Sequence, residues 1–562
     1  MSDGVVSPAE HEKLREEREK LAATVTAQRE LISSLQGKNA ALENALINHA
    51  DEIELLKRRL FGARSERGGT HELQLLLGEI LTEEVALQKQ LDELRGDPKG
   101  DDTNKESSEK PKQKPKGRRD LSLSSLPKVI VDLTDPVLAE KGELIGFDES
   151  RQLGRRRGGF YVVVKRTAKY RIPGADGPTV LSVDVPKSAL SRGMLHTSLL
   201  AWLAVEKFAL GVPHHRLEQH LVAEGVPLDR SVMSRNMEEL GNLLGATIAH
   251  TMLEHARTSC AVLSTDATGA AIQPGPRESG PKRPCKKGHF FTIVADRDHV
   301  LFEYANEHSS NVVSRLFQGF TGFLQSDASS VYDILERGPP ALDERGPTLV
   351  GCWAHGRRYF FEAAVCKYRV GLEGLQRIRA IYSADNQLAK LPPSDRTTRR
   401  RELVAPLIED FFCWVKEQSR SSAARNLASK ALGYATNQEH ELRRVLDDGR
   451  LPLDNTRSER ALRKIVVGRK NWLFYGSDLH AQAAAAIFSV IASCRLHGLD
   501  PVAYIDEVLR LLAVWPRERY LEITPLQWAA TRARLSAAEL EDPIRPITVP
   551  PPLAPTSDPP TG

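Results

Sequence analysis

The chain has 562 residues and a mass of 62.3 kDa, which is too long for one hydrophobic core and predicts several folded units joined by connectors. Its 41% hydrophobic and 27% charged residues, without an apolar run of roughly 20 residues, argue against a membrane protein. The N-terminal segment lacks the apolar stretch of a signal peptide, so we expect a cytoplasmic protein. Six scattered cysteines without a C-x-x-C pair argue against a disulfide framework and a zinc ribbon, and the net charge of +4 leaves a polyanionic partner open.

Residues 11–60 carry a heptad repeat that predicts a coiled coil. Asn39 lies at a seam position, where a buried amide favours two parallel strands, so the segment is expected to form a homodimer. A long solvated helix is the alternative. One seam position of the repeat is mostly leucine: Leu14, Leu21, Leu35, Leu42 and Leu56. A helical extension over 61–96 and a disordered basic linker over 97–125 are expected to follow.

Two small modules are predicted after the linker. Residues 126–187 contain strand-like stretches around a glycine-arginine loop, Gly154 to Gly159, and read as a β-rich module. Residues 188–245 show helical periodicity and contain a helix, a turn ending at Gly225 and a second helix, the layout of a helix-turn-helix. Packing alone would produce a similar pair of helices. If the module binds DNA, the candidate contacts at the start of its second helix are Ser231, Ser234 and Arg235.

Residues 246–510 have the order of elements that predicts a ribonuclease-H-like α/β domain. A buried strand over 261–272 has Asp266 in its middle, and two strands around the turn at 296–298 form a hairpin. A helix then precedes a fourth strand that ends on Asp327, and a fifth strand leads into a helix beginning at Trp353. In this layout the first and fourth strands are neighbours, which would bring the two aspartates together. A helical insertion is expected over about 368–447.

Clustered carboxylates repel one another and gain proton affinity unless cations bind between them. Oxygen ligands of this kind suit Mg²⁺ or Mn²⁺. A pair of such ions supports in-line phosphoryl transfer, with one ion activating the attacking oxygen and the other stabilising the departing one. The sequence therefore predicts a two-ion site for cleaving and joining nucleic acid strands.

A third acid is needed on a later helix, and Glu459 and Glu362 are the candidates. Glu362 follows the fifth strand at compact spacing but could equally be a solvated helix residue. Glu459 is preferred because Asn455 can cap its helix and Arg463 lies one turn further along the same face. The segment Gly468 to Trp472 reads as a basic loop suited to phosphate. Arg463, Arg469 and Lys470 are therefore candidate DNA contacts.

Several motifs in the right order resemble the transposase of the insertion sequence 66 family, over about residues 11–510. They include Leu60 to Glu66, the strands around Asp266 and Asp327, Gly351 to Arg358, Asn455 to Arg460, and Gly468 to Pro501. The resemblance implies a DDE transposase that cuts transposon ends and joins them to target DNA with divalent metal. It places Asp266, Asp327 and Glu459 at the catalytic positions.

Relatives usually carry two C-x-x-C pairs in the β-rich module, whereas residues 126–186 contain no cysteine. Zinc binding by this module is not expected, although Arg155, Arg156 and Arg157 could still bind DNA. Cys352 and His355 are interpreted as structural, because two ligands alone make no closed zinc site. C-terminal helices over 511–542 and a disordered proline-rich tail over 543–562 complete the chain.

The combined prediction is a multidomain α+β DNA transposase, dimeric or of higher order, acting on DNA in the bacterial cytoplasm, with accessory proteins as further candidate partners. A noncatalytic DNA-binding protein derived from a transposase, and a metal-dependent nuclease without strand transfer, are the alternatives. The intact acids at 266, 327 and 459 favour an enzyme.

Overall fold

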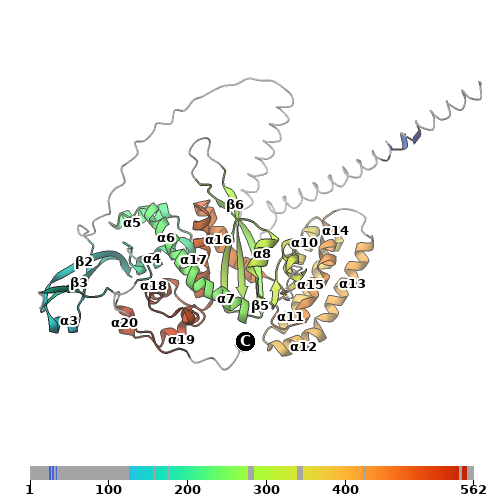
Figure 1. Ribbon diagram of the computed structural model, residues 1–562. Coiled ribbons are helices and arrows are strands. Elements are labelled where there is room, and N and C mark those ends of the chain that lie inside the picture. Colours follow the sequence, from blue (N-terminus) through green and yellow to red (C-terminus); the bar gives the residue numbers. More distant parts are fainter. Residues whose placement is uncertain are drawn as a thin grey trace, which may run out of the picture. The chain divides into compact units, whose positions relative to one another are not determined.

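The computed structural model describes residues 25, 26, 28–30, 33, 126–156, 159–173, 178–185, 188–190, 193–275, 284–337, 346–421, 426–542 and 547–553 (Figure 1). The few described residues before 126 are helical. The predicted coiled coil (11–60) otherwise lies outside the described residues, as do the helical extension (61–96), the basic linker (97–125) and most of the tail (543–562). The chain divides into two compact units: residues 112–354, 391–398 and 441–562 form the larger, and residues 1–111, 355–390 and 399–440 form the other.

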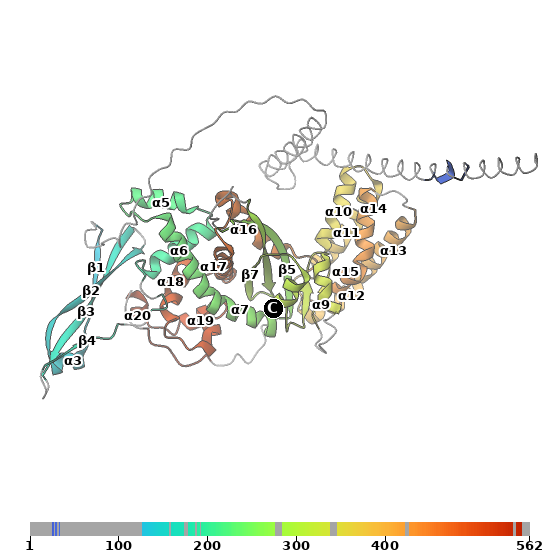
Figure 2. The same ribbon diagram turned by 45° about the horizontal axis from the view of Figure 1, so that its top comes forward.

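The larger unit begins with a twisted sheet in which two long strands form a hairpin (Figure 2). β3 (Gly159–Ile172) lies between β2 (Glu143–Arg156), which is antiparallel, and β1 (Lys128–Leu133), which is parallel. The short β4 (Thr179–Ser182) pairs with the end of β3, and α3 (Pro136–Lys141) joins β1 to β2. The predicted glycine-arginine loop is therefore wrong in its extent, because Gly154 and Arg155 pair with Tyr161 and Phe160 inside the ladder.

Helices continue from this sheet. Leu153 bridges to Leu195, and the ring of Phe160 packs edge-on against Trp202, with centroids 5.7 Å apart. The elements are α4 (Thr197–Ala204), the π-helical η2 (Val205–Ala209), α5 (His214–Ala223), α6 (Arg230–Leu244), the π-helical η3 (Gly245–Ala249) and α7 (His250–Ser259). The turn at Gly225 has a positive φ of 75°, as a tight stop after α5 requires. α6 runs on through η3 into α7 rather than ending near residue 245.

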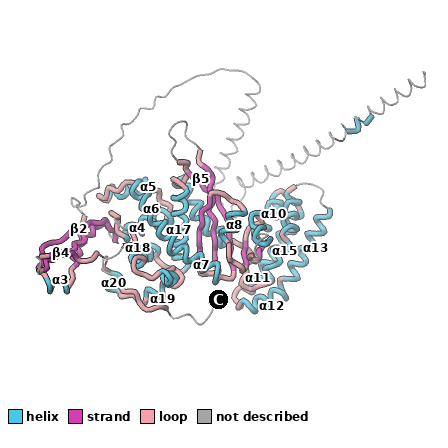
Figure 3. The backbone as a smooth tube through the Cα atoms, viewed as in Figure 1, coloured by secondary structure: helices cyan, strands magenta, loops and turns pink. Residues whose placement is uncertain are grey.

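The central sheet has the order β7-β6-β5-β8-β9. Figure 3 shows its strands in magenta among the helices. β5 (Val262–Ile272), β6 (Lys286–Ala295) and β7 (His299–Ala305) are antiparallel, whereas β8 (Phe323–Gln325) and β9 (Thr348–Val350) continue the sheet parallel to β5. β5 and β8 are neighbours, as the predicted order of elements requires. Between these strands lie α8 (Ser310–Leu316), η4 (Ser330–Tyr332) and α9 (Asp333–Arg337).

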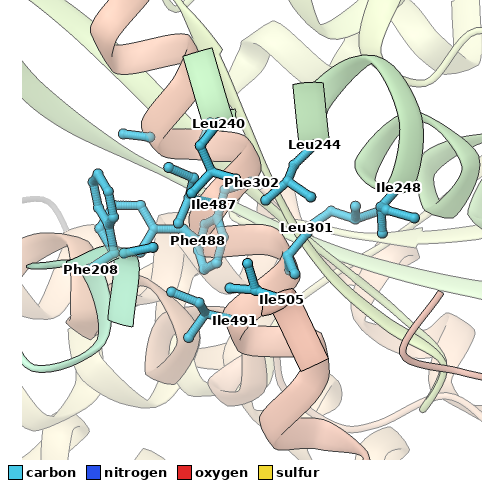
Figure 4. Packing of buried hydrophobic residues seen from close by; sticks show 14 of the residues in the cluster. Phe208, Leu240, Leu244, Ile248, Leu301, Phe302, Ile487, Phe488, Ile491 and Ile505 are labelled. Carbon is cyan, nitrogen blue, oxygen red and sulfur yellow. The ribbon is translucent and has the colours of Figure 1, made fainter. Parts of the chain in front are cut away.

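Two helices pack on this sheet, α16 (Thr456–Trp472) and α17 (Asp478–Leu496). The alanine-rich α17 is the one described helix whose length and composition would suit a membrane span, but 67% of its most apolar stretch is buried in the protein. Its side chains, among them Phe488 and Ile491, meet residues from the sheet and from helix α6 in the core (Figure 4). The composition of α17 is therefore that of a core helix.

The edge strand β7 is bonded to α17 through two serine hydroxyls. The Phe302 amide donates to Ser489 Oγ (2.8 Å), and the Val300 amide donates to Ser493 Oγ (3.0 Å). The Ser493 hydroxyl donates back to the Val300 carbonyl oxygen (3.0 Å), whereas Ser489 Oγ lies 3.3 Å from the Phe302 carbonyl oxygen and 2.8 Å from that of Ala485 in its own helix. These serines lie one helical turn apart, so one face of α17 satisfies the outer backbone groups of the strand.

The C-terminal part of the larger unit is helical. It contains α18 (Pro501–Leu511), η6 (Arg517–Ile523), α19 (Trp528–Arg532) and α20 (Ala537–Glu541). The Tyr504 hydroxyl donates to the Ile523 carbonyl (2.6 Å), and its ring packs edge-on against Trp528. Thr197 of α4 donates to Asp506 of α18 (2.5 Å), so this region is joined to the first helices.

The other unit is a helical bundle that contains most of α10 (Trp353–Val365) and α11 (Arg369–Gln387), α13 (Ala405–Ser421) and α14 (Leu427–Asn437). Phe360, Phe411 and Trp414 form an aromatic cluster in its core, and the buried Arg400 guanidinium forms two hydrogen bonds to Asp385. The elements at its borders are α12 (Pro393–Leu403), α15 (Glu439–Arg443) and η5 (Arg444–Leu446). These helices lie where the sequence predicts a helical insertion.

Candidate active site

Asp266 and Asp327 are positioned by the two adjacent strands β5 and β8. Asp266 lies in the middle of β5, opposite Thr292 of β6. Ser264 lies two residues earlier and therefore on the same face of the sheet; it pairs in register with Gln325, the last residue of β8. Asp327 follows Gln325 by two residues, and its carboxylate accepts a hydrogen bond from the Ser329 amide (3.3 Å).

Glu459 lies in the first turn of α16. The buried residues of this helix, Ser458, Leu462, Ile465 and Gly468, follow the helical period and define the stripe that faces the protein interior. Glu459 is on one flank of that stripe, with Arg463 one turn further along.

The three acids interact electrostatically. Burial raises the pKa of Asp266 to about 6, a hydrogen bond from the Ala267 amide (2.7 Å) opposes the rise, and the negative charges of Asp327 and Glu459 add to it. Burial also raises the pKa of the neighbouring Tyr332 above its ordinary range, and the charges of Asp327 and Asp266 raise it further. The structure thus brings together acids from three distant segments of the chain.

Asn455, the residue before α16, does not cap the helix with its side chain, so that detail of the prediction is wrong. Its amide nitrogen donates instead to the carbonyl oxygen of Thr265 (3.3 Å), and its Oδ1 accepts from the Cys352 thiol (3.1 Å). The Asp454 carboxylate accepts from the Thr456 amide (3.1 Å) and replaces Asn455 at the helix start. Asn455 and Cys352 are fully buried, which agrees with a structural role for this cysteine.

Glu362, the alternative third acid, belongs to the helical unit rather than to the unit that contains Asp266 and Asp327. It lies in α10 and forms an ion pair with Arg358 at 3.5 Å, one helical turn away. The charges that act on Asp266 include that of Glu459. We therefore retain Glu459 as the candidate.

The predicted basic loop at 468–472 is wrong, because these residues form the last turn of α16. A single glycine costs a helix only about 1 kcal/mol and does not interrupt it here. The indole of Trp472 occupies the space where a Cβ of Gly468 would lie. The Arg469 guanidinium donates to Gly269 O and to Thr268 Oγ1, so it ties the helix to β5. Arg463 and Lys470 are exposed.

The other candidate DNA contacts lie away from the acids in sequence. Ser231 and Arg235 are exposed and Ser234 is half-buried in the first two turns of α6, where the helix-turn-helix interpretation places them. Arg155 is half-buried, and its guanidinium lies 4.6 Å from the ring centroid of Trp202. The side chain of Arg156 and all of Arg157 lie outside the described part of the chain.

The acids at 266, 327 and 459 fit the hard divalent cation that the sequence predicts. Their donors are all carboxylate oxygens, which Mg²⁺ and Mn²⁺ accept. Burial raises the pKa of Asp266, the charges of Asp327 and Glu459 add to the rise, and a bound cation would oppose it by favouring the ionised carboxylate. These three side chains would hold the ions.

The chain matches known protein families. The family model described as "Transposase IS66 family" matches residues 192–483, more than half of the chain and the part that contains all three acids. This chain belongs to the IS66 transposase family. Two further models match parts of this transposase: "Transposase C of IS166 homeodomain" over residues 50–131 and "IS66 C-terminal element" over residues 489–526.

Among its relatives are two uncharacterized proteins of Sinorhizobium fredii. Protein y4qI is 26% identical over 514 residues, covering 88% of this IS66-family chain and 91% of the relative. Protein y4hP is 26% identical over 393 residues, covering 66% and 69%. Among solved structures, the Drosophila P element transposase strand transfer complex matches with 9% identity and a TM-score of 0.34, over 53% of this chain and 92% of the other.

Sequence reasoning missed the residues that hold the acids in place. Gln325 is fully buried, and its amide donates to the Pro452 carbonyl (2.9 Å), which connects the end of β8 to the segment before α16. Asn455 makes the equivalent connection to β5. The sequence carries only a weak signal for these two residues. A glutamine at the end of an apolar strand and an asparagine four residues before Glu459 are polar, and buried polar groups are normally hydrogen-bonded.

Proposed function

We propose that this chain is a DNA transposase that cleaves the ends of its own element and joins them to target DNA, with Asp266, Asp327 and Glu459 as its catalytic acids. The observation that carries the proposal is that the charges of Asp327 and Glu459 both act on Asp266 within one folded unit. The family match and the strand order β7-β6-β5-β8-β9 support a ribonuclease-H-like catalytic domain.

In this function, two bound divalent cations would supply Lewis acidity for in-line transfer at a DNA phosphate. The protein's own part is to hold the carboxylates in one geometry. Gln325 and Asn455 fix β8 and β5 relative to the start of α16. Arg463 and Lys470, exposed on the same flank of α16 as Glu459, are placed to bind backbone phosphates of the strand being cut.

The other modules would select and pair the DNA. The exposed start of α6 (Ser231, Arg235) is proposed to contact the element's ends, with Ser234 beside it. Arg155, Arg156 and Arg157 are proposed to add phosphate contacts. A coiled coil over residues 11–60 would hold two chains together, so the active assembly is a dimer or a higher oligomer. The proposal places this assembly on bacterial DNA in the cytoplasm, with accessory proteins as further partners.

The test is a cleavage and joining assay on the terminal repeats with Mg²⁺. The wild type is expected to cut and join, whereas Asp266→Asn and Asp327→Asn should bind the ends normally in a gel-shift assay and lose about a thousandfold or more of the cleavage rate, because an amide cannot replace a carboxylate ligand. The exposed Glu541→Gln is the matched control and should retain activity. Cutting at wild-type rate by either aspartate variant would refute the assignment, and cutting without joining would identify a nuclease.

A further inference from the structure

A second site lies beside the acids on the central sheet. A pocket of about 590 Å³ opens between the β6–β7 hairpin, α16 and α17. Its floor is aromatic and is formed by the buried Phe208, Phe302 and Phe488. The ring centroid of Phe488 lies 5.1 Å from that of Phe208 and 5.9 Å from that of Phe302. Figure 4 shows these three side chains packed together in the core. The rim carries five exposed cations: Arg297, Arg457, Arg460, Lys464 and Arg495.

The nearby acids do not balance the charge of these cations, although the negative charge of Asp454 acts on Arg457 and favours its charged form. None of the five forms an ion pair or a side-chain hydrogen bond with any residue that the structure describes. Asp296 is the acid that lines the pocket, but its carboxylate accepts hydrogen bonds from the Ala261 and Val262 amides, at 2.8 and 3.1 Å. Partial desolvation lowers the pKa of Arg457, and the charges of Arg297, Arg396 and Arg460 lower it further. The rim is thus positive and crowded, and an anion would relieve this repulsion.

The pocket and Glu459 lie on opposite flanks of α16. Successive residues of an α-helix are rotated by about 100° around its axis. This rotation places Glu459 and Arg463 on one flank of the buried stripe of α16. The pocket-lining residues Arg457, Ala461 and Lys464 lie on the other flank. The floor and the acids share a face of the sheet, because Val294, which lines the pocket, lies two residues from the partner of Asp266 on β6. Such diagonal neighbours are about 7–8 Å apart.

We propose that this pocket binds one unpaired nucleotide of the DNA strand next to the phosphate that is cut. The base would lie on the aromatic floor, and the adjoining phosphates would bind the guanidinium groups of Arg457 and Arg460 on the rim. A flat apolar base and an anionic backbone match a pocket that has an aromatic floor and an unpaired cationic rim, which is how single strands are bound without sequence preference. The inference rests on the proposed function, since the strand is the one that the acids would cut.

The pocket gives the enzyme a way to open the end of its element. A duplex must lose a base pair before a base enters the pocket, so binding would cost unpairing energy, which is smallest when the nucleotide is already unpaired. The protein is therefore expected to favour ends with a mismatch at one position near the cut. Removing that base while keeping its phosphates should abolish the preference.

The test measures binding without cutting, using full-length Asp266→Asn protein and terminal-repeat duplexes with a single mismatch moved one position at a time across the cut site. One mismatch position should bind about tenfold more tightly than the paired duplex, and an abasic nucleotide there should lose this gain. Adding Arg457→Gln with Arg460→Gln, or filling the pocket with Ala461→Leu, should remove the preference. The exposed Arg517→Gln, which lies outside the pocket, should retain it.

The outcomes separate this inference from the proposed function. Wild-type protein that cuts ends but shows no mismatch preference, or variants that keep the preference, would overturn the pocket assignment alone. A gain that survives removal of the base would refute the floor contact. The inference would also be overturned if the protein showed no mismatch preference but bound a free deoxynucleoside triphosphate tightly, and if the Arg457→Gln/Arg460→Gln variant lost that binding. The pocket would then be a site for a free nucleotide.

Discussion

The side-chain amide of Asn455 donates a hydrogen bond to the carbonyl oxygen of Thr265, the residue that precedes Asp266. Because Asn455 immediately precedes α16, this bond links the strand of Asp266 to the helix of Glu459. The linkage is fully buried, so solvent cannot replace it. Positioning of the acids relative to one another thus depends on a residue that touches neither substrate nor metal.

Asn455→Ala should lower the cleavage rate more than it lowers DNA binding, because the acids keep their identity and lose their alignment. It leaves the Thr265 carbonyl and the Cys352 thiol without this partner, and we expect a loss of about 1–3 kcal/mol in the free energy of unfolding. Parallel measurements of thermal unfolding and single-turnover cleavage would check both effects. The exposed Asn437→Ala, at the end of α14, is the control for the same substitution in a helix.

Asp266→Asn should stabilise the metal-free protein at high pH. The pKa of Asp266 in the folded protein is about 6, above its ordinary value of 3.8, so the folded state binds this proton more tightly than the unfolded state. Stability from this group is therefore present below pH 4 and is lost as pH rises through 6. With a chelator present, the Asn variant should gain about 2–3 kcal/mol over wild type at pH 8 and nothing at pH 4.

Divalent cation should reverse that difference. Metal binding needs the ionised carboxylate, so Mg²⁺ is expected to raise the Tm of the wild type at pH 8 and to have little effect below pH 6. The Asn variant should respond weakly at either pH. An equal Mg²⁺ response in both proteins would remove Asp266 from the metal site.

Glu459→Gln should abolish cleavage, and Glu362→Gln should leave it within about threefold of wild type. Glu459 acts electrostatically on Asp266, whereas Glu362 lies in the helical unit and pairs with Arg358. Both changes keep side-chain volume, so circular dichroism should show the same fold. If the Glu362 variant alone is inactive, the third acid is misassigned.

Gly241→Ala should destabilise the protein strongly. A Cβ at Gly241 of α6 would lie 2.3 Å from the Ala483 carbonyl oxygen of α17, and backbone on both sides cannot move independently. We expect a loss of about 2 kcal/mol or more in the free energy of unfolding. Gly433→Ala, in helix α14 with open space around it, is the matched control and should be neutral or slightly stabilising.

The buried ion pair of the helical unit should be costly to break. Arg400 donates to both oxygens of Asp385 (2.6 and 3.1 Å), and both side chains are almost fully buried. Arg400→Met should cost about 3–5 kcal/mol, because it leaves a buried carboxylate uncompensated. The double change with Asp385→Leu should recover much of that loss in a thermal unfolding experiment, since it removes both charges.

The order of strands and the pairing of β5 with β8 could be predicted from the sequence, because apolar runs and turn residues mark each strand and the layout fixes neighbours. The position of Glu459 relative to Asp266 depends on how α16 crosses the sheet. The local sequence pattern does not encode this crossing, so the prediction of Glu459 as the third acid rested on motif resemblance. The prediction of a basic loop over residues 468–472 was wrong because, in the sequence, a glycine that packs against Trp472 cannot be told from a glycine in a turn.

The basic pocket was equally invisible in the sequence. Arg457, Arg460 and Lys464 read as an exposed helix face, whereas Arg297 lies 160 residues before Arg457 and Arg495 lies 31 residues after Lys464. Only the packing of the hairpin against α16 and α17 gathers them around one aromatic floor. Charge that is separated in sequence becomes informative once the fold shows which cations share a cavity.

The two serines of α17 also bear on how copies of this protein meet. An uncovered edge strand can recruit a strand from another chain and seed aggregation. Ser489 and Ser493 occupy the outward backbone groups of Val300 and Phe302, so this margin of the sheet cannot be extended by a neighbour. Chains crowded onto the same piece of DNA can therefore lie side by side without fusing their sheets along β7.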